Sequence, residues 1–212
     1  DLVQKMIKVV MNSFYGVLGL ICIPAAATIT HIGRQMLRES GEWVRNFGET
    51  CATTKDGGPA GTFQLVYGDT DSLFFSFSNA NTPEEAAYIA VQCADHVTAR
   101  YDKEVMERNN RFRADGLPHL AVVDKNCRVL EFEKVFTCLL LHSAKKYSGI
   151  LHEYRHDGTI VCRGPKHSGT ANKKRDVCPY VRDLYERMYN SKANWDEKNK
   201  SVVEHDAATA DD

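Results

Sequence analysis

A short acidic run between two apolar segments constrains the fold of this chain more than any other part of its sequence. The run consists of Tyr67, Gly68, Asp69, Thr70, Asp71 and Ser72. Residues 63–66 before it and 73–77 after it are rich in apolar and aromatic residues, which is typical of β-strands. Two such strands around a polar, glycine-containing turn predict a hairpin over residues 62–78 with both carboxylates at its tip.

The two aspartates of this hairpin are candidate metal ligands. Asp is almost never fully buried unless it is paired or bound to a metal, so core packing does not explain them. Oxygen ligands at a turn suit a hard divalent cation. An EF-hand is excluded: with Asp69 at loop position 1, Phe74 replaces the required Gly and Ala80 the required Glu. An isolated Asp-x-Asp pair is more often a solvated turn, so further evidence is needed.

Composition sets the class of protein. The 212 residues are 43% hydrophobic and 26% charged, which allows a sizeable core. No apolar run reaches about 18 residues, so we expect no membrane span. The seven cysteines include no C-x-x-C pair, which favours free thiols in a reducing compartment over zinc or disulfides. The first residue is not Met and no secretory signal follows, so we expect a fragment of a longer protein.

Charge is uneven along the chain although the formal net charge is only −1. A stretch of residues 163–175 contains basic residues and no acid: Arg163, Lys166, Lys173, Lys174 and Arg175. Local basic patches, rather than net charge, indicate contact with nucleic acid.

Apolar periodicity predicts an α+β chain. We expect helices over residues 2–18, 26–47 and 179–189, and another that starts within residues 79–85 and runs to about residue 109. Gly16, Gly19 and Pro24 are expected to end the first helix. Further strands are expected over residues 128–136, with an apolar continuation to 141, and in a hairpin of residues 147–154 and 159–162. Residues after 191 are polar and rich in Ala and Asp, and we expect them to be disordered.

The first helix carries an unusual polar face. Four side chains fall within an arc of roughly 80° at 3.6 residues per turn: Lys5, Lys8, Asn12 and Tyr15. A cation, an amide and a phenol in line suit a phosphate, a sugar and a base. Taken alone, this face is more often an ordinary solvated surface.

Two motifs together resemble family B (polymerase-alpha-like) DNA polymerases. The pattern Lys8-x-x-x-Asn12-Ser13-x-Tyr15-Gly16 is similar to their motif B, and residues 67–72 are identical to their motif C. Residues 24–37 and 130–141 are most similar to herpesvirus polymerases. The resemblance covers about residues 1–190, and the two motifs in this order outweigh the solvated-turn interpretation.

The resemblance implies a polymerase palm, an antiparallel sheet with packed helices, plus the end of the fingers and the start of the thumb. Residues 1–18 correspond to the last fingers helix, 19–162 to the palm and 163–190 to the start of the thumb. Residues 191–212 are expected to form a disordered tail.

The resemblance also implies an activity, cofactors and partners. Such an enzyme transfers nucleotides from dNTPs to a primer 3′-OH as a template directs. Two Mg²⁺ ions about 3.5–4 Å apart, with Mn²⁺ as a substitute, activate the 3′-oxygen and stabilise the leaving pyrophosphate. The expected partners are primer–template DNA, dNTPs and a processivity factor, with no membrane. The expected location is the nucleus, which is the host nucleus for a viral protein.

Residue roles carry over through the two motifs. Lys8 corresponds to a contact with the triphosphate of the incoming nucleotide, and Asn12 lies beside it. Tyr15 packs under the nascent base pair. Asp71 binds the catalytic metals, and Asp69 is the second, supporting carboxylate.

DNA contacts carry over through motif C and through two further segments. Thr70 lies in motif C. Lys145-Lys146-Tyr147 resembles the Lys-Lys-Arg-Tyr motif that grips the primer–template duplex, with Ala144 in place of its first Lys. Lys174 and Arg175 begin a segment similar to the Arg-Arg-Asp-x-Cys-Pro element near the thumb.

Two alternatives remain to be compared with this interpretation. A reverse transcriptase places adjacent aspartates in its catalytic turn, whereas Thr70 separates them here. A non-catalytic nucleic-acid-binding scaffold is favoured by the absence of motif A, which supplies the other metal-binding Asp in this family. Intact Asp69 and Asp71 argue against it. We therefore expect a polymerase whose 212-residue piece is inactive alone.

Overall fold

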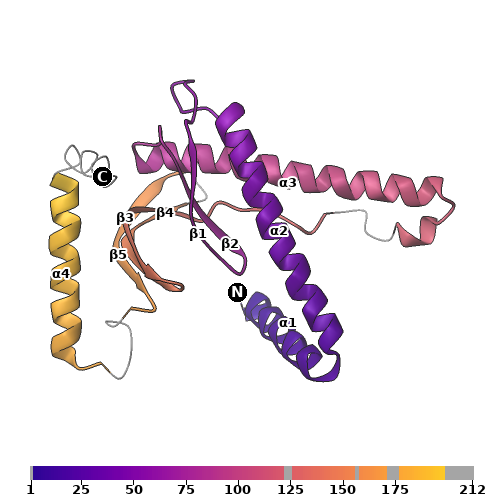
Figure 1. Cartoon of the computed structure of the whole chain (residues 1–212), viewed down its shortest axis with the longest axis horizontal. Coiled ribbons are helices and arrows are strands. Elements are labelled where there is room, and N and C mark those ends of the chain that lie inside the picture. The colour runs from indigo at the N-terminus through magenta and orange to yellow at the C-terminus, as the bar shows by residue number, and fades with distance from the viewer. Residues whose placement is uncertain (1, 122–125, 156–157, 171–176, 199–212) are drawn as a thin grey trace, which may run out of the picture.

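The fold is known from a computed structural model, which describes residues 2–121, 126–155, 158–170 and 177–198. Side chains are described over the same ranges except for Tyr15 and residues 189–198. The chain mixes long helices with two small antiparallel sheets, which confirms the predicted α+β class (Figure 1).

The described residues form four α-helices, one short 3₁₀ helix and five strands. They are α1 (Leu2–Ile21), α2 (Ile23–Thr50), β1 (Phe63–Asp69), β2 (Ser72–Phe77), α3 (Pro83–Ala114), the short 3₁₀ helix η1 (Pro118–Leu120), β3 (Lys134–Ser143), β4 (Lys146–Tyr154), β5 (Ile160–Ser168) and α4 (Pro179–Lys198). The strands β1 and β2 form one sheet, and β3, β4 and β5 form the other in that order. In Figure 1, the three-stranded sheet lies between α4 and the β1–β2 hairpin.

The first two helices meet at Cys22, where the sequence had predicted a longer break. Gly16 and Gly19 lie inside α1, and Pro24 lies in the first turn of α2 instead of ending α1. Proline is tolerated there because first-turn amides have no intrahelical partner. None of the described side chains of α1 is buried. No helix among the described residues is long and apolar enough to span a lipid bilayer.

The main core forms where α2, α3 and the β1–β2 hairpin meet. Its buried members are Trp43, Val44, Ala52, Ala60, Phe77, Ile89, Cys93, Val97 and Tyr101. The helix α3 begins within the predicted start segment of residues 79–85, and the Thr82 hydroxyl caps it by accepting from the Glu85 amide at 3.2 Å. Burial raises the pKa of the Cys93 thiol to about 12, so this thiol stays neutral at physiological pH.

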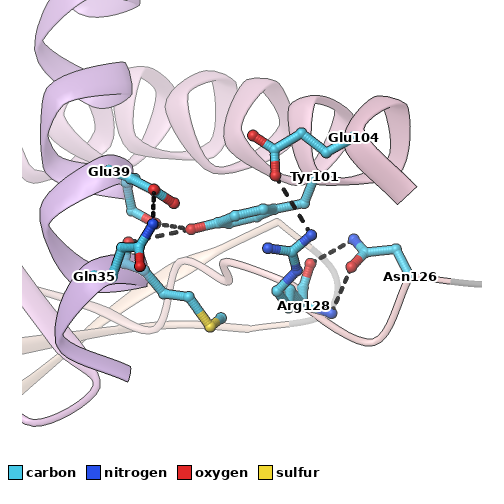
Figure 2. A network of polar contacts seen from close by, with 8 residues as sticks. Gln35, Glu39, Tyr101, Glu104, Asn126 and Arg128 are labelled. Atoms are coloured by element: carbon cyan, nitrogen blue, oxygen red, sulfur yellow. Dashed lines mark hydrogen bonds and ion pairs between the residues drawn. The ribbon is translucent and has the colours of Figure 1, made fainter. Parts of the chain in front are cut away.

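A polar network ties α2 and α3 together beside this core (Figure 2). The Tyr101 hydroxyl donates to the Met36 carbonyl oxygen at 3.1 Å and contacts the Ser40 hydroxyl at 3.0 Å. The Arg128 guanidinium lies 4.3 Å from the centre of the Tyr101 ring and 3.4 Å from the Glu104 carboxylate. Burial, the largest cause, raises the pKa of the Tyr101 phenol, so the phenol stays protonated and remains a donor.

The strand expected over residues 128–136 is largely wrong, because β3 begins only at Lys134. The preceding segment is attached to α3 by side-chain hydrogen bonds instead of a strand ladder. The Leu130 amide donates to the Thr98 hydroxyl at 3.1 Å, and the Asn126 side chain bonds both polar groups of the Arg128 backbone. The alternation of apolar residues in this segment is compatible both with a strand and with an extended segment attached to a helix, so the sequence did not distinguish them.

Two elements at the C-terminal side are longer than predicted. The strand β5 runs to Ser168, so the basic residues Arg163 and Lys166 lie on a strand that pairs with β4. The last helix continues to Lys198. The disorder expected from residue 191 is therefore wrong for residues 191–198, and residues 199–212 lie outside the described part of the chain.

The close approach of Gly48 to the Phe77 ring gives a test of the core packing. A Cβ atom at Gly48 of α2 collides with the Phe77 ring, whereas one at Gly33 of the same helix meets nothing within 4 Å. We expect Gly48→Ala to lower the free energy of unfolding by about 1–3 kcal/mol through overpacking. Gly33→Ala should raise it by roughly 0.5–1 kcal/mol through helix propensity. Chemical denaturation measures both, and equal effects of the two variants would contradict this packing.

Candidate functional site

A β-bulge in β1 turns the acidic hairpin toward the three-stranded sheet. The register with β2 shifts between Leu65 and Tyr67, which leaves Val66 as an extra residue. Because side chains alternate along a strand, one extra residue moves everything after it to the other face. Phe63 on one side of the bulge packs against the core phenylalanine Phe77, whereas Tyr67 beyond it packs against Phe74.

The tip of the hairpin is a tight turn with a left-handed residue. Asp69 pairs with Ser72, and the Asp71 amide donates to the Asp69 carbonyl oxygen at 2.6 Å. Thr70 between them has φ 52°, a conformation that a β-branched residue rarely adopts. Such strained residues cluster at functional sites, where the surrounding structure holds them in place.

The two carboxylates at the tip have different surroundings. The Thr70 hydroxyl donates to Asp69 Oδ1 at 3.0 Å, and Lys145 Nζ lies 3.4 Å from the same oxygen. The Asp71 carboxylate is exposed and has no hydrogen-bond or ion-pair partner among the described residues. Within that part of the chain no three His, Cys, Asp or Glu side chains gather as a metal site, so the turn offers two carboxylates at most.

The turn between β3 and β4 lies directly against the acidic hairpin. The Lys145 amide donates to the Tyr67 hydroxyl at 2.9 Å, across 78 positions of sequence. Lys145 has φ 63°, and a Cβ atom at Gly169 would collide with its carbonyl oxygen. The backbone of this turn is therefore held from both sides, by a phenol of β1 and by a residue that follows β5.

Aromatic rings fill the space between the two hairpins. The Tyr147 ring lies 5.5 Å from that of Phe74, 5.8 Å from that of Phe136 and 6.4 Å from that of Tyr67, measured between centroids. Phe74 and Phe136 stack at 5.9 Å. Aromatic pairs at these separations are mutually attractive beyond their buried area. The cluster fixes the acidic turn relative to Lys145 and Lys146.

The polar face of α1 is open. Lys8 and Asn12 are exposed, and neither side chain has a hydrogen-bond or ion-pair partner in the described part of the chain. No such contact connects them to the acidic turn. The side chain of Tyr15 lies outside the described residues.

The predicted DNA-contacting residues fall into two groups. The structure brings Thr70, Lys145 and Tyr147 together around the acidic turn, with Lys146 next to them and exposed. Lys174 and Arg175 lie outside the described residues.

Sequence reasoning missed three features of the site. It assigned no role to the Tyr67 hydroxyl or to Gly169, and it treated Lys145 as a phosphate contact without connecting it to Asp69. Gly169 carried no clear sequence signal, because the predicted strand ended at residue 162, and its left-handed φ of 59° is seen only in the structure. The pairing of Lys145 with Asp69 had no local signal, because 75 intervening residues fold before the two meet.

The chain is similar to catalytic subunits of DNA polymerases over most of its length. A sequence profile described as DNA polymerase family B matches residues 1–114 and 120–207. The DNA polymerase catalytic subunit of Psittacid herpesvirus 1 is 29% identical over 204 residues, which cover 90% of this chain and 16% of that protein.

Two further relatives have similar coverage. The DNA polymerase catalytic subunit of Human herpesvirus 7 is 32% identical over 177 residues, 77% of this chain and 15% of that protein. The DNA polymerase delta catalytic subunit of Bos taurus is 30% identical over 188 residues, 85% of this chain and 14% of that protein. This chain thus spans about one sixth of the length of these relatives or less. Since the family profile covers nearly the whole chain, including both hairpins of the site, the chain belongs to DNA polymerase family B.

Proposed function

We propose that this chain carries part of the nucleotide-adding centre of a DNA-directed DNA polymerase. The reaction is template-directed transfer of a nucleotide from a dNTP to a primer 3′-OH, in DNA replication in the nucleus. The observation that supports it best is the contact between the acidic turn of residues 69–72 and the turn between β3 and β4. The latter carries Lys145 and Lys146 and is called the basic turn below. The Tyr67 hydroxyl bonds the Lys145 amide at 2.9 Å, which places carboxylates and ammonium groups at one site.

In this proposal the elements correspond to parts of a polymerase. Residues 1–18 are the end of the fingers, residues 19–162 form the palm and residues 163–190 begin the thumb. The palm assignment is supported by the antiparallel sheets and the helices that pack on them. The open polar face of α1 suits an incoming nucleotide, with Lys8 as a point charge for the triphosphate, Asn12 beside it and Tyr15 under the new base pair.

Asp71 is the residue most suited to hold Mg²⁺. Its carboxylate is exposed and unpartnered among the described residues, and Mg²⁺ in such enzymes is usually bound by one or two carboxylates plus substrate phosphates. When bound, the metal ions neutralise developing charge and activate the primer 3′-oxygen. Further protein ligands must come from residues other than the two aspartates of this turn.

Asp69 then acts as a supporting carboxylate. The Thr70 hydroxyl and Lys145 Nζ both contact its Oδ1 atom, at 3.0 and 3.4 Å. These contacts restrain the Asp69 side chain and partly neutralise its charge. The Lys145 side chain remains 71% exposed, so a DNA phosphate has access to the same ammonium group. Phosphate contacts of this kind position a duplex without reading its sequence.

The metal-ligand role of Asp71 predicts loss of nucleotide addition in Asp71→Asn. Metal ions contribute several kcal/mol of transition-state stabilisation, so the rate should fall by roughly a thousandfold or more. Primer–template affinity should change little, because the amide keeps the shape of the side chain. Single-nucleotide extension by the protein from the complete open reading frame measures the rate. Asp102→Asn, at an exposed position on α3, is the matched control. Normal extension by Asp71→Asn would refute the assignment.

The phosphate contact of Lys145 predicts a change in salt dependence. Lys145→Ala should weaken duplex binding and reduce the slope of log affinity against log salt by roughly 0.9, the value for one contact with B-form DNA. Titration of a labelled primer–template at several salt concentrations measures the slope. Lys55→Ala is the control, since Lys55 is exposed in the loop before β1, away from the turn. Equal slopes for Lys145→Ala and the wild type would contradict the contact.

A further inference from the structure

One hydroxyl group on α4 contacts both ends of the basic turn. The Tyr185 oxygen lies 2.7 Å from His142 Nε2 near the end of β3, and 3.3 Å from the Ser148 hydroxyl in β4. The segment between these two partners carries Lys145, Lys146 and Tyr147. Tyr185 therefore bridges the two strands at the point where they enter the turn.

The cluster continues into the third strand. Ser148 is fully buried, and its hydroxyl lies 2.9 Å from Nδ1 of His167, the residue opposite it on β5. The His167 ring is also 5.8 Å from the Tyr185 ring, in an edge-on arrangement. All three strands and α4 thus meet in one chain of polar contacts.

With both histidines neutral, each contact in this series can have one donor and one acceptor. The three contacts need three protons, of which the hydroxyls of Tyr185 and Ser148 supply two. A neutral imidazole donates through one nitrogen and accepts through the other. When one of the two facing nitrogens, in His142 or His167, carries a proton and the other does not, every contact has one donor and one acceptor. Tyr185 takes part in two of the three contacts, so removal of its hydroxyl interrupts this series of hydrogen bonds.

The apolar side chains of α4 do not replace this attachment. Tyr180, Val181, Leu184 and Met188 are all exposed, whereas Tyr185 is half-buried against the sheet. A hydroxyl with two partners on different strands is directional, as apolar burial is not. The hydrogen bonds at Tyr185 thus help to specify the orientation of α4 relative to the turn.

We propose that Tyr185 is a positioning residue for duplex DNA. By holding His142 and Ser148 together, its hydroxyl keeps the turn of residues 143–147 in the shape in which its lysines meet phosphates. It also couples that turn to the position of α4. The inference rests on the proposed polymerase function, and it concerns retention of DNA rather than the chemical step.

The test is a Tyr185→Phe variant of the protein from the complete open reading frame. Dissociation of a fluorescent primer–template should be about fivefold faster, the factor for one lost hydrogen bond of ordinary strength. Nucleotide addition at saturating DNA should change by less than about twofold, because a positioning residue acts on binding. The control is Tyr180→Phe, an exposed tyrosine of the same helix. Equal dissociation rates for the two variants would overturn the proposal.

A second pair of variants separates positioning from general destabilisation. Glutamine at position 142 presents an amide near the place of His142 Nε2, the contacted atom, whereas asparagine reaches only the place of Nδ1. We expect His142→Gln to retain DNA nearly as the wild type does and His142→Asn to behave like Tyr185→Phe. Identical dissociation rates for these two variants would overturn the proposal.

The outcomes also distinguish this inference from the proposed function. A wild-type protein that extends primers, with Tyr185→Phe indistinguishable from Tyr180→Phe, refutes the positioning role alone. A wild-type protein that neither binds nor extends primed DNA refutes both.

Discussion

The hydrogen bond from the Lys145 amide to the Tyr67 hydroxyl is the contact on which the arrangement of the site depends. It joins two hairpins that are 78 residues apart in sequence and belong to different sheets. The extra residue Val66 makes it possible, because the bulge turns Tyr67 away from the core that Phe63 and Phe77 occupy. Rings of both hairpins then pack around the bond.

This contact also explains why the two aspartates of the turn differ in their surroundings. Lys145 is brought to Asp69, which leaves Asp71 as the carboxylate without a partner among the described residues. An exposed ion pair of this kind stabilises a fold by only about 0.2–1 kcal/mol, so its value lies in placement rather than stability. A site that handles phosphates and metal ions needs both signs of charge held at fixed positions, because positioning and charge neutralisation supply most of the catalysis of phosphoryl transfer.

Local sequence signals predicted the elements of the fold better than their connections. The placement of Asp69 and Asp71 at a hairpin tip and the start of α3 within residues 79–85 follow from local turn and helix-start signals and were predicted correctly. The segment before Lys134 was mistaken for a strand, because its hydrogen bonds go to Thr98 on a distant helix. The same limit applies to Lys145 and Tyr185, whose partners become neighbours only through tertiary packing. The nucleotide-binding role of Lys8 and Asn12 stays a prediction.

The most direct test of this account is amide hydrogen exchange at Lys145, resolved at single residues and compared between the wild type and Tyr67→Phe. Loss of one hydrogen bond of about 1 kcal/mol should speed exchange of the Lys145 amide about fivefold. Amides in the core helix α3 should be unaffected, since Tyr67 lies outside that core. An unchanged rate at Lys145 would show that the phenol does not hold the two turns together, and would contradict the account.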